Sequence, residues 1–575
     1  MKNVNIKIDG KSYNVPENYT VLDACKEAGI KIPVLCYHPD LRQVGSCRLC
    51  VVEIEGQRTF QPSCAYNVYE GMEVKTNTKE VRAARKMALE LILSRHPMDC
   101  LNCERNTQCE LQDLAADFGI TEVDFALQLP GYDIDDENGI IVREHDKCIN
   151  CGRCVRACQE VQTVNALEFH KRGYEKIAYT TAGKKLQDTT CTYCGQCINV
   201  CPTGALHEND ETAKVWEWIE DPNTHVVVQT APAIRVSIGE AMGLDAGFLS
   251  TGKLVAGLRR LGFDKVFDTD FTADLTIIEE GHELLHRLKN NGTLPMITSC
   301  SPGWIKFVET FFPDCLDHVS SCKSPQQMFG ALAKTYYPEK SGVDPKTIKS
   351  ISIMPCTAKK YECNRPEMKD SGYQDVDVVL TTRELAKMFK VAGVDFAVID
   401  EEKYDDPFGI TTGAAAIFGA TGGVMEAALR TVYEVVTGEE LPDVNLTMCR
   451  GLEGVKEATV QVGDIPVKVA VANGLSNARK ILDKVRAGEA DYHFIEIMCC
   501  PGGCIGGGGQ PRPTSPEKRQ ARMESIYCED AQMEIRKSHK NPSIDVIYKE
   551  FLKEPLGEKS HHLLHTKYTK RDSNR

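Results

Sequence analysis

The sequence lacks a long hydrophobic run, an excess of basic residues and an apolar segment near its N-terminus. Its longest apolar-looking stretch, residues 413–425 (GAAAIFGATGGVM), is too short and too rich in glycine to span a bilayer. The formal net charge of −14 argues against nucleic acid or an anionic membrane as the main partner. The N-terminus, MKNVNIKIDG, alternates polar and apolar residues like a β-strand and does not resemble an export signal. We therefore predict a protein of the reducing cytoplasm that binds neither membrane nor nucleic acid.

Cysteine is the residue type that the sequence has in abundance. The chain of 575 residues contains 26 cysteines. A chain of this length is too long for a single core, so we expect several domains. A disulfide-stapled fold would explain many cysteines only in a short secreted chain. In a reducing compartment, clustered cysteines indicate metal ligands.

The first cysteine group belongs to a predicted small β domain. Alternating apolar residues on both sides of Gly10 predict a β-hairpin, and Thr20 with Asp23 predicts the capping box of a helix over residues 21–28. We expect Cys25, on this helix, to be a buried thiol. Four cysteines spaced C-x10-C-x2-C-x13-C suit a [2Fe-2S] cluster, although a four-cysteine zinc site also uses a C-x2-C pair. The candidate ligands are Cys36, Cys47, Cys50 and Cys64.

The second group follows a predicted helix over residues 81–95. Its dense apolar positions, which include Met87 and Leu91, predict a helix packed on one broad face. Its basic residues could dock an acidic electron carrier, but a solvated helix face is the simpler interpretation. The spacing His-x3-Cys-x2-Cys-x5-Cys then suits a [4Fe-4S] cluster with one histidine ligand, or a zinc site with the same ligands. The candidate ligands are His96, Cys100, Cys103 and Cys109.

The third group is an internal repeat that favours iron-sulfur clusters over zinc. Residues 148–158 (CINCGRCVRAC) and residues 191–201 (CTYCGQCINVC) both have the spacing C-x2-C-x2-C-x3-C. This is the bacterial two-cluster ferredoxin pattern, in which the fourth cysteine of each run ligates the other cluster. We therefore predict two [4Fe-4S] clusters. One is expected on Cys148, Cys151, Cys154 and Cys201, and the other on Cys191, Cys194, Cys197 and Cys158.

From about residue 210 the sequence changes to an α/β pattern in which several buried strands end in cysteine. Cys300 follows LPMITS, Cys356 follows SISIMP, and Cys499 with Cys500 follows FIEIM, with Cys504 four residues beyond. Groups at the carboxyl ends of such strands converge on a crevice in α/β folds. The glycines of CCPGGCIGGGGQP permit close backbone approach and positive φ angles. Because a series of metal centres precedes this region, we expect these cysteines to hold a terminal redox cluster.

Three segments of this region resemble the signature segments of [FeFe]-hydrogenases. They are TSCSPGW (298–304), MPCTAKKYE (354–362) and MCCPGGCIGGGGQP (498–511). The preceding series of one [2Fe-2S] cluster, one histidine-ligated cluster and two ferredoxin clusters resembles the large monomeric clostridial type, and the resemblance covers essentially the whole chain. It implies reversible reduction of protons to H2 with ferredoxin as electron partner, and maturation proteins that supply the diiron subsite.

The resemblance also implies the cofactors: one [2Fe-2S] cluster, three accessory [4Fe-4S] clusters and a catalytic H-cluster. The H-cluster joins a [4Fe-4S] cubane to a diiron unit that carries CO, cyanide and azadithiolate. By position, Cys356, Cys500 and Cys504 look like cubane ligands, with Cys504 as the bridge to the diiron unit. Lys359 and the backbone near Pro232 would contact cyanide. Two methionines would line the diiron pocket, Met354 and Met498.

A buried metal site also needs a proton path. In LTIIEEGHELLHRL (275–288), the residues Glu280, Glu283 and Arg287 fall on one helical face. Alone, such charges are typical of a solvated stripe. The resemblance assigns a proton path to this face, with Arg287 at its outer end. The other path members would be Cys300, Glu280, Ser320 and Glu283.

Ser301 departs from the pattern of the family. The first motif there is normally TSCCP, in which the first cysteine relays protons and the second ligates the cubane, whereas here Ser301 follows Cys300. A serine hydroxyl is a weaker acid and a harder donor than a thiol, and would be a poorer iron ligand. Three candidates for the fourth cubane ligand remain open: Ser301 as an alkoxide, Cys300 in place of its relay role, or Cys499 as a replacement thiolate. The second needs the fewest new chemical species. Ala233 and Ala358 also stand where serine often contacts the diiron unit.

Together these patterns predict a multidomain α+β and α/β protein. The expected parts are a β-grasp [2Fe-2S] domain (1–80), a histidine-ligated [4Fe-4S] domain (81–125), a two-[4Fe-4S] ferredoxin-like domain (126–209) and a C-terminal α/β hydrogenase catalytic domain (210–575). Two other interpretations stay open: an H2-sensing or low-turnover relative with the same cofactor, and an electron-transfer iron-sulfur subunit. Three histidines near the C-terminus are expected at the surface, namely His561, His562 and His565.

Overall fold

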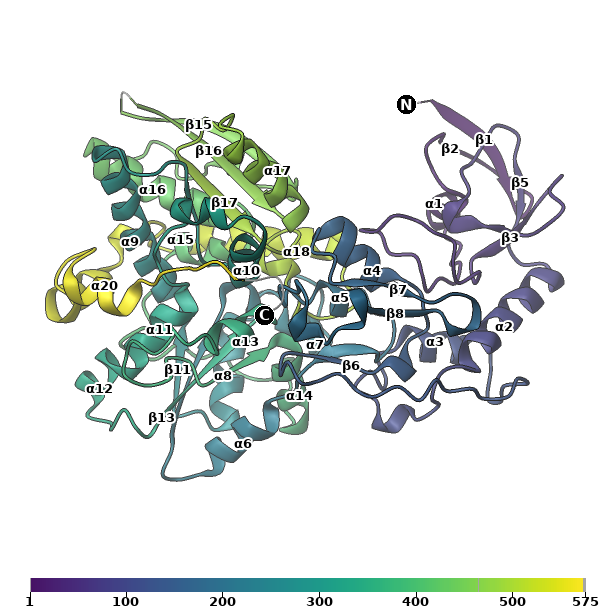
Figure 1. Cartoon of the computed structure of the whole chain (residues 1–575), viewed down its shortest axis with the longest axis horizontal. Coiled ribbons are helices and arrows are strands. Elements are labelled where there is room, and N and C mark those ends of the chain that lie inside the picture. Colours follow the sequence, from purple (N-terminus) through teal and green to yellow (C-terminus); the bar gives the residue numbers. More distant parts are fainter. Residues whose placement is uncertain (1, 464, 572–575) are drawn as a thin grey trace. The chain divides into compact units, whose positions relative to one another are not determined.

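The computed structural model describes residues 2–463 and 465–571, and the chain forms two compact units (Figure 1). Unit 1 comprises Met1–Glu160, Asn165–Leu186 and Val200–His207, and unit 2 comprises Val161–Val164, Gln187–Asn199 and Glu208–Arg575. Each unit is therefore assembled from three separate segments. Within the described part of the chain, none of the helices combines the length and apolar character that a bilayer crossing requires.

Unit 1 begins with a five-stranded sheet in the order β2-β1-β5-β3-β4. The predicted hairpin is confirmed as β1 (Asn3–Ile8) and β2 (Lys11–Pro16), and alternate side chains of β1 are buried. The predicted capping box is also confirmed, since the Thr20 hydroxyl accepts a hydrogen bond from the Asp23 N–H at the start of α1 (Val21–Glu27). The remaining strands of this sheet are β3 (Val51–Ile54), β4 (Gln61–Pro62) and β5 (Glu73–Lys75).

The predicted second helix is α2 (Lys79–Leu93), but its surface differs from the prediction in two respects. Met87 and Leu91 are 57% and 50% exposed, so the packed face is narrower than the apolar pattern indicated. Arg85 is buried and donates from Nε and Nη2 to the Val51 carbonyl oxygen at 3.1 and 2.7 Å, so it does not belong to a basic docking face. The other elements of unit 1 are α3 (Glu110–Asp117), β6 (Ile141–Arg143), α4 (Arg153–Arg156), β7 (Leu167–His170), β8 (Ile177–Thr180) and β9 (Leu206–Glu208), whose last residue lies in unit 2.

Unit 2 contains two four-stranded sheets. The first has the order β11-β10-β13-β14 and is parallel throughout, and its strands are almost continuously buried, as parallel strands covered on both faces must be. The second has the order β12-β17-β16-β15 and is parallel except for the β15-β16 hairpin. The strands are β10 (His225–Thr230), β11 (Lys265–Asp268), β12 (Met296–Ile297), β13 (Ile348–Met354), β14 (Val378–Thr381), β15 (Val455–Val462), β16 (Ile465–Asn473) and β17 (Phe494–Met498).

Helices connect and cover these two sheets (Figure 1). They are α5 (Gln196–Asn199), α6 (Thr212–Glu220), α7 (Ile238–Ala241), α8 (Thr251–Leu261), α9 (Thr269–Lys289), α10 (Pro302–Phe311), α11 (Pro325–Lys334), α12 (Tyr336–Ser341), α13 (Ala358–Cys363), α14 (Thr382–Val391), α15 (Gly413–Ala416), α16 (Gly423–Thr437), α17 (Leu475–Arg486), α18 (Pro516–Gln532), α19 (Pro542–Ile547) and α20 (Glu558–Leu564).

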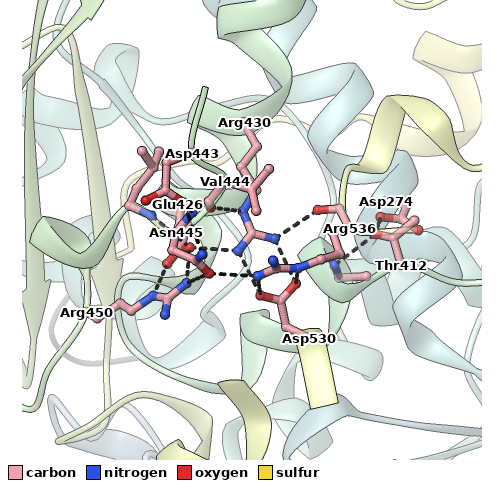
Figure 2. Close-up of polar contacts among 12 residues, drawn as sticks. Asp274, Thr412, Glu426, Arg430, Asp443, Val444, Asn445, Arg450, Asp530 and Arg536 are labelled. Atoms are coloured by element: carbon pink, nitrogen blue, oxygen red, sulfur yellow. Dashed lines mark hydrogen bonds and ion pairs between the residues drawn. The ribbon is translucent and has the colours of Figure 1, made fainter. Parts of the chain in front are cut away.

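A buried ionic network joins α16 to α18, as Figure 2 shows. Arg430 donates to both carboxylate oxygens of Asp530 at 2.9 Å and to Glu426 at 2.7 Å. Arg450 and Arg536 complete the network by pairing with Glu426 and Asp530, respectively. Burial alone would raise the pKa of Asp530, but the hydrogen bonds from the two arginines lower it. Each buried charge thus has an opposite partner, which such a site requires because an unpaired ion in the interior is costly.

Candidate functional site

A cavity of about 710 Å³ in unit 2 lies where strands from both sheets end. The loop after β13 contributes Cys356, the loop after β12 contributes Cys300 and Ser301, and the segment after β17 contributes Cys499 and Cys500. The structure therefore confirms that these strand ends converge, because carboxyl ends of parallel strands share one edge. The cavity is also lined by Pro232, Met354, Lys359, Met498 and Cys504, so the predicted pocket residues are present.

The cysteines of this cavity are buried or partly buried. Burial, followed by the charge of Cys500, raises the pKa of Cys504 to about 12, and burial also raises the pKa of Cys356. Lys359 is held by a salt bridge of 2.8 Å to Glu362 and donates to the Cys300 carbonyl oxygen at 3.1 Å. The cavity thus combines soft sulfur donors, apolar walls and one fixed cation, a donor set suited to an iron-sulfur group.

The glycine-rich loop 502–509 packs against protein backbone. A Cβ atom on Gly507 would lie 2.0 Å from the Pro355 carbonyl oxygen, and one on Gly508 would lie 2.2 Å from the Cys194 carbonyl oxygen. The loop is also tied to the segment Gln187–Asn199, since Gln196 donates to the Gly506 carbonyl oxygen at 2.9 Å. Asn199 donates to the carbonyl oxygen of Gly507 at the same distance. The glycines therefore let three backbones approach one another beside the cavity.

A polar chain runs from the cavity along α9. Glu280 is buried, and burial, followed by the negative charge of Glu283, raises its pKa to about 8, against the opposing effect of a hydrogen bond with Ser320. Ser320 Oγ donates to Glu283 Oε2 at 2.9 Å, and Arg287 Nη2 donates to Glu283 Oε1 at 2.7 Å. Cys300 is close enough to Glu280 that the carboxylate charge, after burial, raises the pKa of the thiol. The structure thus brings all five predicted path residues together, with Arg287 nearest the surface.

His565 was expected at the surface, and this prediction was wrong. The side chain is only 3% exposed, and its two ring nitrogens lie 2.8 Å from Ser321 Oγ and 3.1 Å from Glu279 Oε2. Ser321 Oγ in turn donates to Glu283 at 3.2 Å, so His565 extends the polar chain of α9. The apolar pair before this histidine, residues 563–564, was the one available signal, because both leucines are buried and carry His565 inward.

The four cysteines of the first group in unit 1 are gathered at one point. The Cys50 thiol donates to Cys64 Sγ at 3.3 Å, and the Cys47 N–H donates to Cys36 Sγ at 3.4 Å. Cys36 also has side-chain hydrogen bonds with Cys47 and Cys64. Cys25 is fully buried in the sheet core, as predicted for a thiol without a ligand role.

The second group has a buried histidine, His96, with one unpartnered ring nitrogen. The residue is only 9% exposed, and its Nδ1 has no hydrogen-bond partner among the residues that the structure describes. Burial, followed by the charge of Lys147, lowers the pKa of His96 to about 4, so the imidazole is neutral at pH 7. A neutral imidazole with a free ring nitrogen is the form that binds a metal.

The two copies of the ferredoxin-like repeat share the backbone conformation of the turn between their first and third cysteines. Asn150 and Tyr193 have φ of 53° and 55°, and each donates its N–H at 3.4 Å to the sulfur of the cysteine two residues earlier. Gly152 and Gly195 follow with φ of 71° and 70°. In unit 1, a cavity of about 520 Å³ is lined by four thiols. They are Cys148, Cys151, Cys154 and Cys201, the set predicted for one cluster.

Family models match the chain along most of its length. Residues 224–508 match the C-terminal domain of the iron only hydrogenase large subunit, and residues 516–571 match the iron hydrogenase small subunit. Three iron-sulfur models match further upstream: a 2Fe-2S iron-sulfur cluster binding domain at 1–79, the NADH-ubiquinone oxidoreductase-G iron-sulfur binding region at 85–124 and a 4Fe-4S dicluster domain at 147–205.

The similarity to known proteins extends over nearly the whole chain. The sequence is 51% identical over 583 residues to the NADP-reducing hydrogenase subunit HndD of Solidesulfovibrio fructosivorans, covering 99% of this chain and 100% of that protein. It is 40% identical over 572 residues to iron hydrogenase 1 of Clostridium pasteurianum, covering 98% and 100%. Among solved structures, the apo [FeFe]-hydrogenase HydA1 from Chlamydomonas reinhardtii is 44% identical with a TM-score of 0.57, covering 63% of this chain and 100% of that one.

Proposed function

The chain belongs to the iron-only hydrogenase family, and from that premise we propose that its unit 2 cavity holds the H-cluster and that ferredoxin is its electron partner. The enzyme is an iron hydrogenase whose iron-sulfur domains form an electron-transfer chain. The observation that carries the proposal is the convergence of cysteine thiols from three strand ends on one apolar cavity beside a fixed lysine. This convergence also argues against an electron-transfer subunit alone, which has no use for such a cavity.

The residues around the cavity fit the proposed cofactor. Cys356, Cys500 and Cys504 would bind the cubane, and Cys504 would bridge to the diiron unit. Lys359, fixed by Glu362, would direct its ammonium group toward a cyanide ligand. Pro232, Met354 and Met498 would form the walls that exclude water from the diiron unit. When bound, the H-cluster supplies the metal centre at which protons and electrons combine to H2.

The polar chain of α9 would carry the protons. Glu280, with a pKa of about 8, holds its proton at pH 7 and can pass it to the Cys300 sulfur once that thiol has given up its own proton. Ser320 links Glu280 to Glu283, and Arg287 orients the Glu283 carboxylate near the surface. Each residue thus either holds a transferable proton or positions a neighbour that does.

The accessory clusters would form the electron path. We assign a [2Fe-2S] cluster to the first cysteine group and a [4Fe-4S] cluster to the second, with His96 as a neutral ligand. Two further [4Fe-4S] clusters are assigned to the repeat, with the ligand sets that its spacing predicts. The thiol-lined cavity in unit 1 supports the set that contains Cys148 and Cys201. The N–H to sulfur hydrogen bonds of Asn150 and Tyr193 would help to set the cluster potentials.

The electron partner has a second candidate. The relative with 51% identity is named as a subunit of an NADP-reducing hydrogenase. We propose that the isolated chain exchanges electrons with ferredoxin, and that NADP would need a further subunit. H2-dependent reduction of ferredoxin by the purified chain, without NADP reduction, is the expected result. Maturation proteins would supply the diiron unit. A reducing cytoplasm fits the 26 cysteines, since none of those in the described part of the chain forms a disulfide.

The test of the proposed function is H2 evolution from a reduced viologen dye. The full-length protein, loaded anaerobically with the diiron cofactor, is compared with an identically loaded hydrogenase that has the TSCCP motif. Turnover within about tenfold of this control is expected. Absence of gas from the loaded protein, with an active control, would refute the enzyme assignment and favour an H2-sensing, low-turnover role.

A further inference from the structure

The fourth ligand of the cubane must be explained, because a [4Fe-4S] cluster normally takes four protein ligands. This inference rests on the proposed function, which uses three cavity cysteines as cubane ligands. The cavity lining contains two further cysteine thiols and one serine hydroxyl, those of Cys300, Cys499 and Ser301. Their surroundings differ, and these differences distinguish their roles.

The Ser301 hydroxyl already has a structural partner. Ser301 is the residue before α10, and its Oγ accepts a hydrogen bond from the backbone N–H of Cys499 at 3.2 Å. Pro302 begins the helix and needs no capping acceptor for its own nitrogen. The hydroxyl therefore connects the start of α10 to the segment after β17. Its oxygen is also a poor match for iron in a sulfur-rich site.

The Cys300 thiol belongs to the polar chain. After burial, the charge of Glu280 and then that of Cys504 raise the pKa of the thiol, so Cys300 lies between the polar chain and the proposed cubane ligands. Its own carbonyl oxygen accepts a hydrogen bond from Lys359. A swing toward the cubane would break the contact between the cavity and Glu280.

The Cys499 thiol lies among the cluster ligands. It forms side-chain hydrogen bonds with Cys194 and with Cys500, and it is 4% exposed. A Cβ atom on Gly303 would lie 2.7 Å from Cys499 Sγ, so the sulfur packs on the first turn of α10 beside Ser301. The backbone of Cys499 is fixed on both sides, because its N–H donates to Ser301 and its carbonyl oxygen accepts from Gln162 at 3.1 Å.

We propose that Cys499 supplies the fourth thiolate of the cubane and that Ser301 holds the Cys499 backbone in position for it. In this arrangement the thiolate comes from the segment after β17, and the Ser301 hydroxyl at the start of α10 holds its backbone in place. The Cys499 thiol releases its proton when the iron–sulfur bond forms, as metal-binding cysteines do. The same sulfur contacts Cys194, a proposed ligand of an accessory cluster, so the cubane and that cluster would have neighbouring ligands.

The test compares variants of the full-length protein, purified anaerobically with its clusters. Cys499→Ala should lose about four iron atoms per chain and one cluster signal in the electron paramagnetic resonance spectrum of the reduced protein. Ser301→Ala and Cys300→Ala should keep the full iron content. The double variant S301C/C499A should regain the iron and the signal. Cys449→Ala is the matched control, because this thiol is buried in the adjoining core outside the cavity lining.

Full iron content in Cys499→Ala would overturn the proposal, as would loss of the cubane iron in Ser301→Ala or Cys300→Ala. The remaining clusters serve as an internal check that each variant is folded. The double variant S301C/C499A restores a fourth cysteine beside the cubane and so tests whether a thiol at this place is what the cluster needs. Iron content is measured without turnover. A wild-type protein that makes no H2 would therefore refute the proposed function while leaving the ligand assignment to be judged on the iron counts alone.

Discussion

Glu280→Gln should abolish most H2 turnover while making the protein more stable at neutral and alkaline pH. The carboxyl group is fully buried, and among the described residues its Oε1 has no hydrogen-bond partner. An amide of the same shape cannot release a proton, and loss of a positioned acid or base costs about 10²-fold or more in rate. A variant that was merely misfolded would lose both turnover and stability. A loss of turnover together with a gain in unfolding free energy therefore identifies Glu280 as a proton relay.

The stability effect follows from the pKa of Glu280, which rises from 4.5 to about 8 through burial. Between these values the unfolded chain ionises while the folded chain keeps its proton. The folded state then binds more protons, so the wild type loses stability as pH rises through this range. At about 1.4 kcal/mol per pH unit, the cost reaches about 5 kcal/mol above pH 8. Glutamine does not titrate, and the variant escapes this loss.

Denaturant unfolding at pH 6 and pH 7.5, followed by circular dichroism under anaerobic conditions, measures the effect. The difference in unfolding free energy between Glu280→Gln and the wild type should grow by about 2 kcal/mol in favour of the variant over this interval. H2 evolution is measured on the same preparations. A variant with turnover within about threefold of the wild type would refute the relay role. A stability difference that does not change with pH would refute the raised pKa.

Three further predictions concern other parts of unit 2. Ser320→Ala removes the hydroxyl between Glu280 and Glu283 and should lower H2 evolution at least tenfold; Ser350→Ala, at a buried hydroxyl without a hydrogen-bond partner in the described residues, should leave it unchanged. Arg430→Met leaves Asp530 and Glu426 short of their central cation and should lower the unfolding free energy by about 3 kcal/mol, whereas an unchanged denaturant midpoint would contradict the ionic role of the network. His565→Phe should lower the unfolding free energy by about 1–3 kcal/mol, because Glu279 and Ser321 lose a buried hydrogen-bond partner. The measurement is again the denaturant midpoint of unfolding.

Local patterns in the sequence predicted the local structure well. The hairpin at Gly10, the capping box at Thr20 and the two matching cysteine repeats depend on neighbours within a few residues, so their residue types were sufficient. The convergence of the cysteines that follow β12, β13 and β17 was also predictable, because parallel strands share one edge.

Tertiary contacts explain where the sequence was not sufficient. Arg85 points inward because a carbonyl group of β3 needs a donor, and no spacing in the sequence shows this. His565 is buried because α20 carries it against α9, far away in the sequence. Ser301 alone indicates a missing ligand, whereas its hydrogen bond with Cys499 depends on the fold, which brings the start of α10 to the end of β17. These features depend on pairs of segments separated by many residues, so no single stretch contains the signal.

The segment Gln187–Asn199 limits how this enzyme can be divided into modules. It belongs to the ferredoxin-like repeat by sequence, yet its Tyr193 carbonyl oxygen accepts from Thr357 at 2.7 Å, and its side chains support the glycine-rich loop. A fragment that starts at residue 210 would lack these partners and expose the backbone beside the cavity. Exchange of electron-input domains between relatives, in the laboratory or during evolution, would therefore have to keep these thirteen residues with the catalytic half.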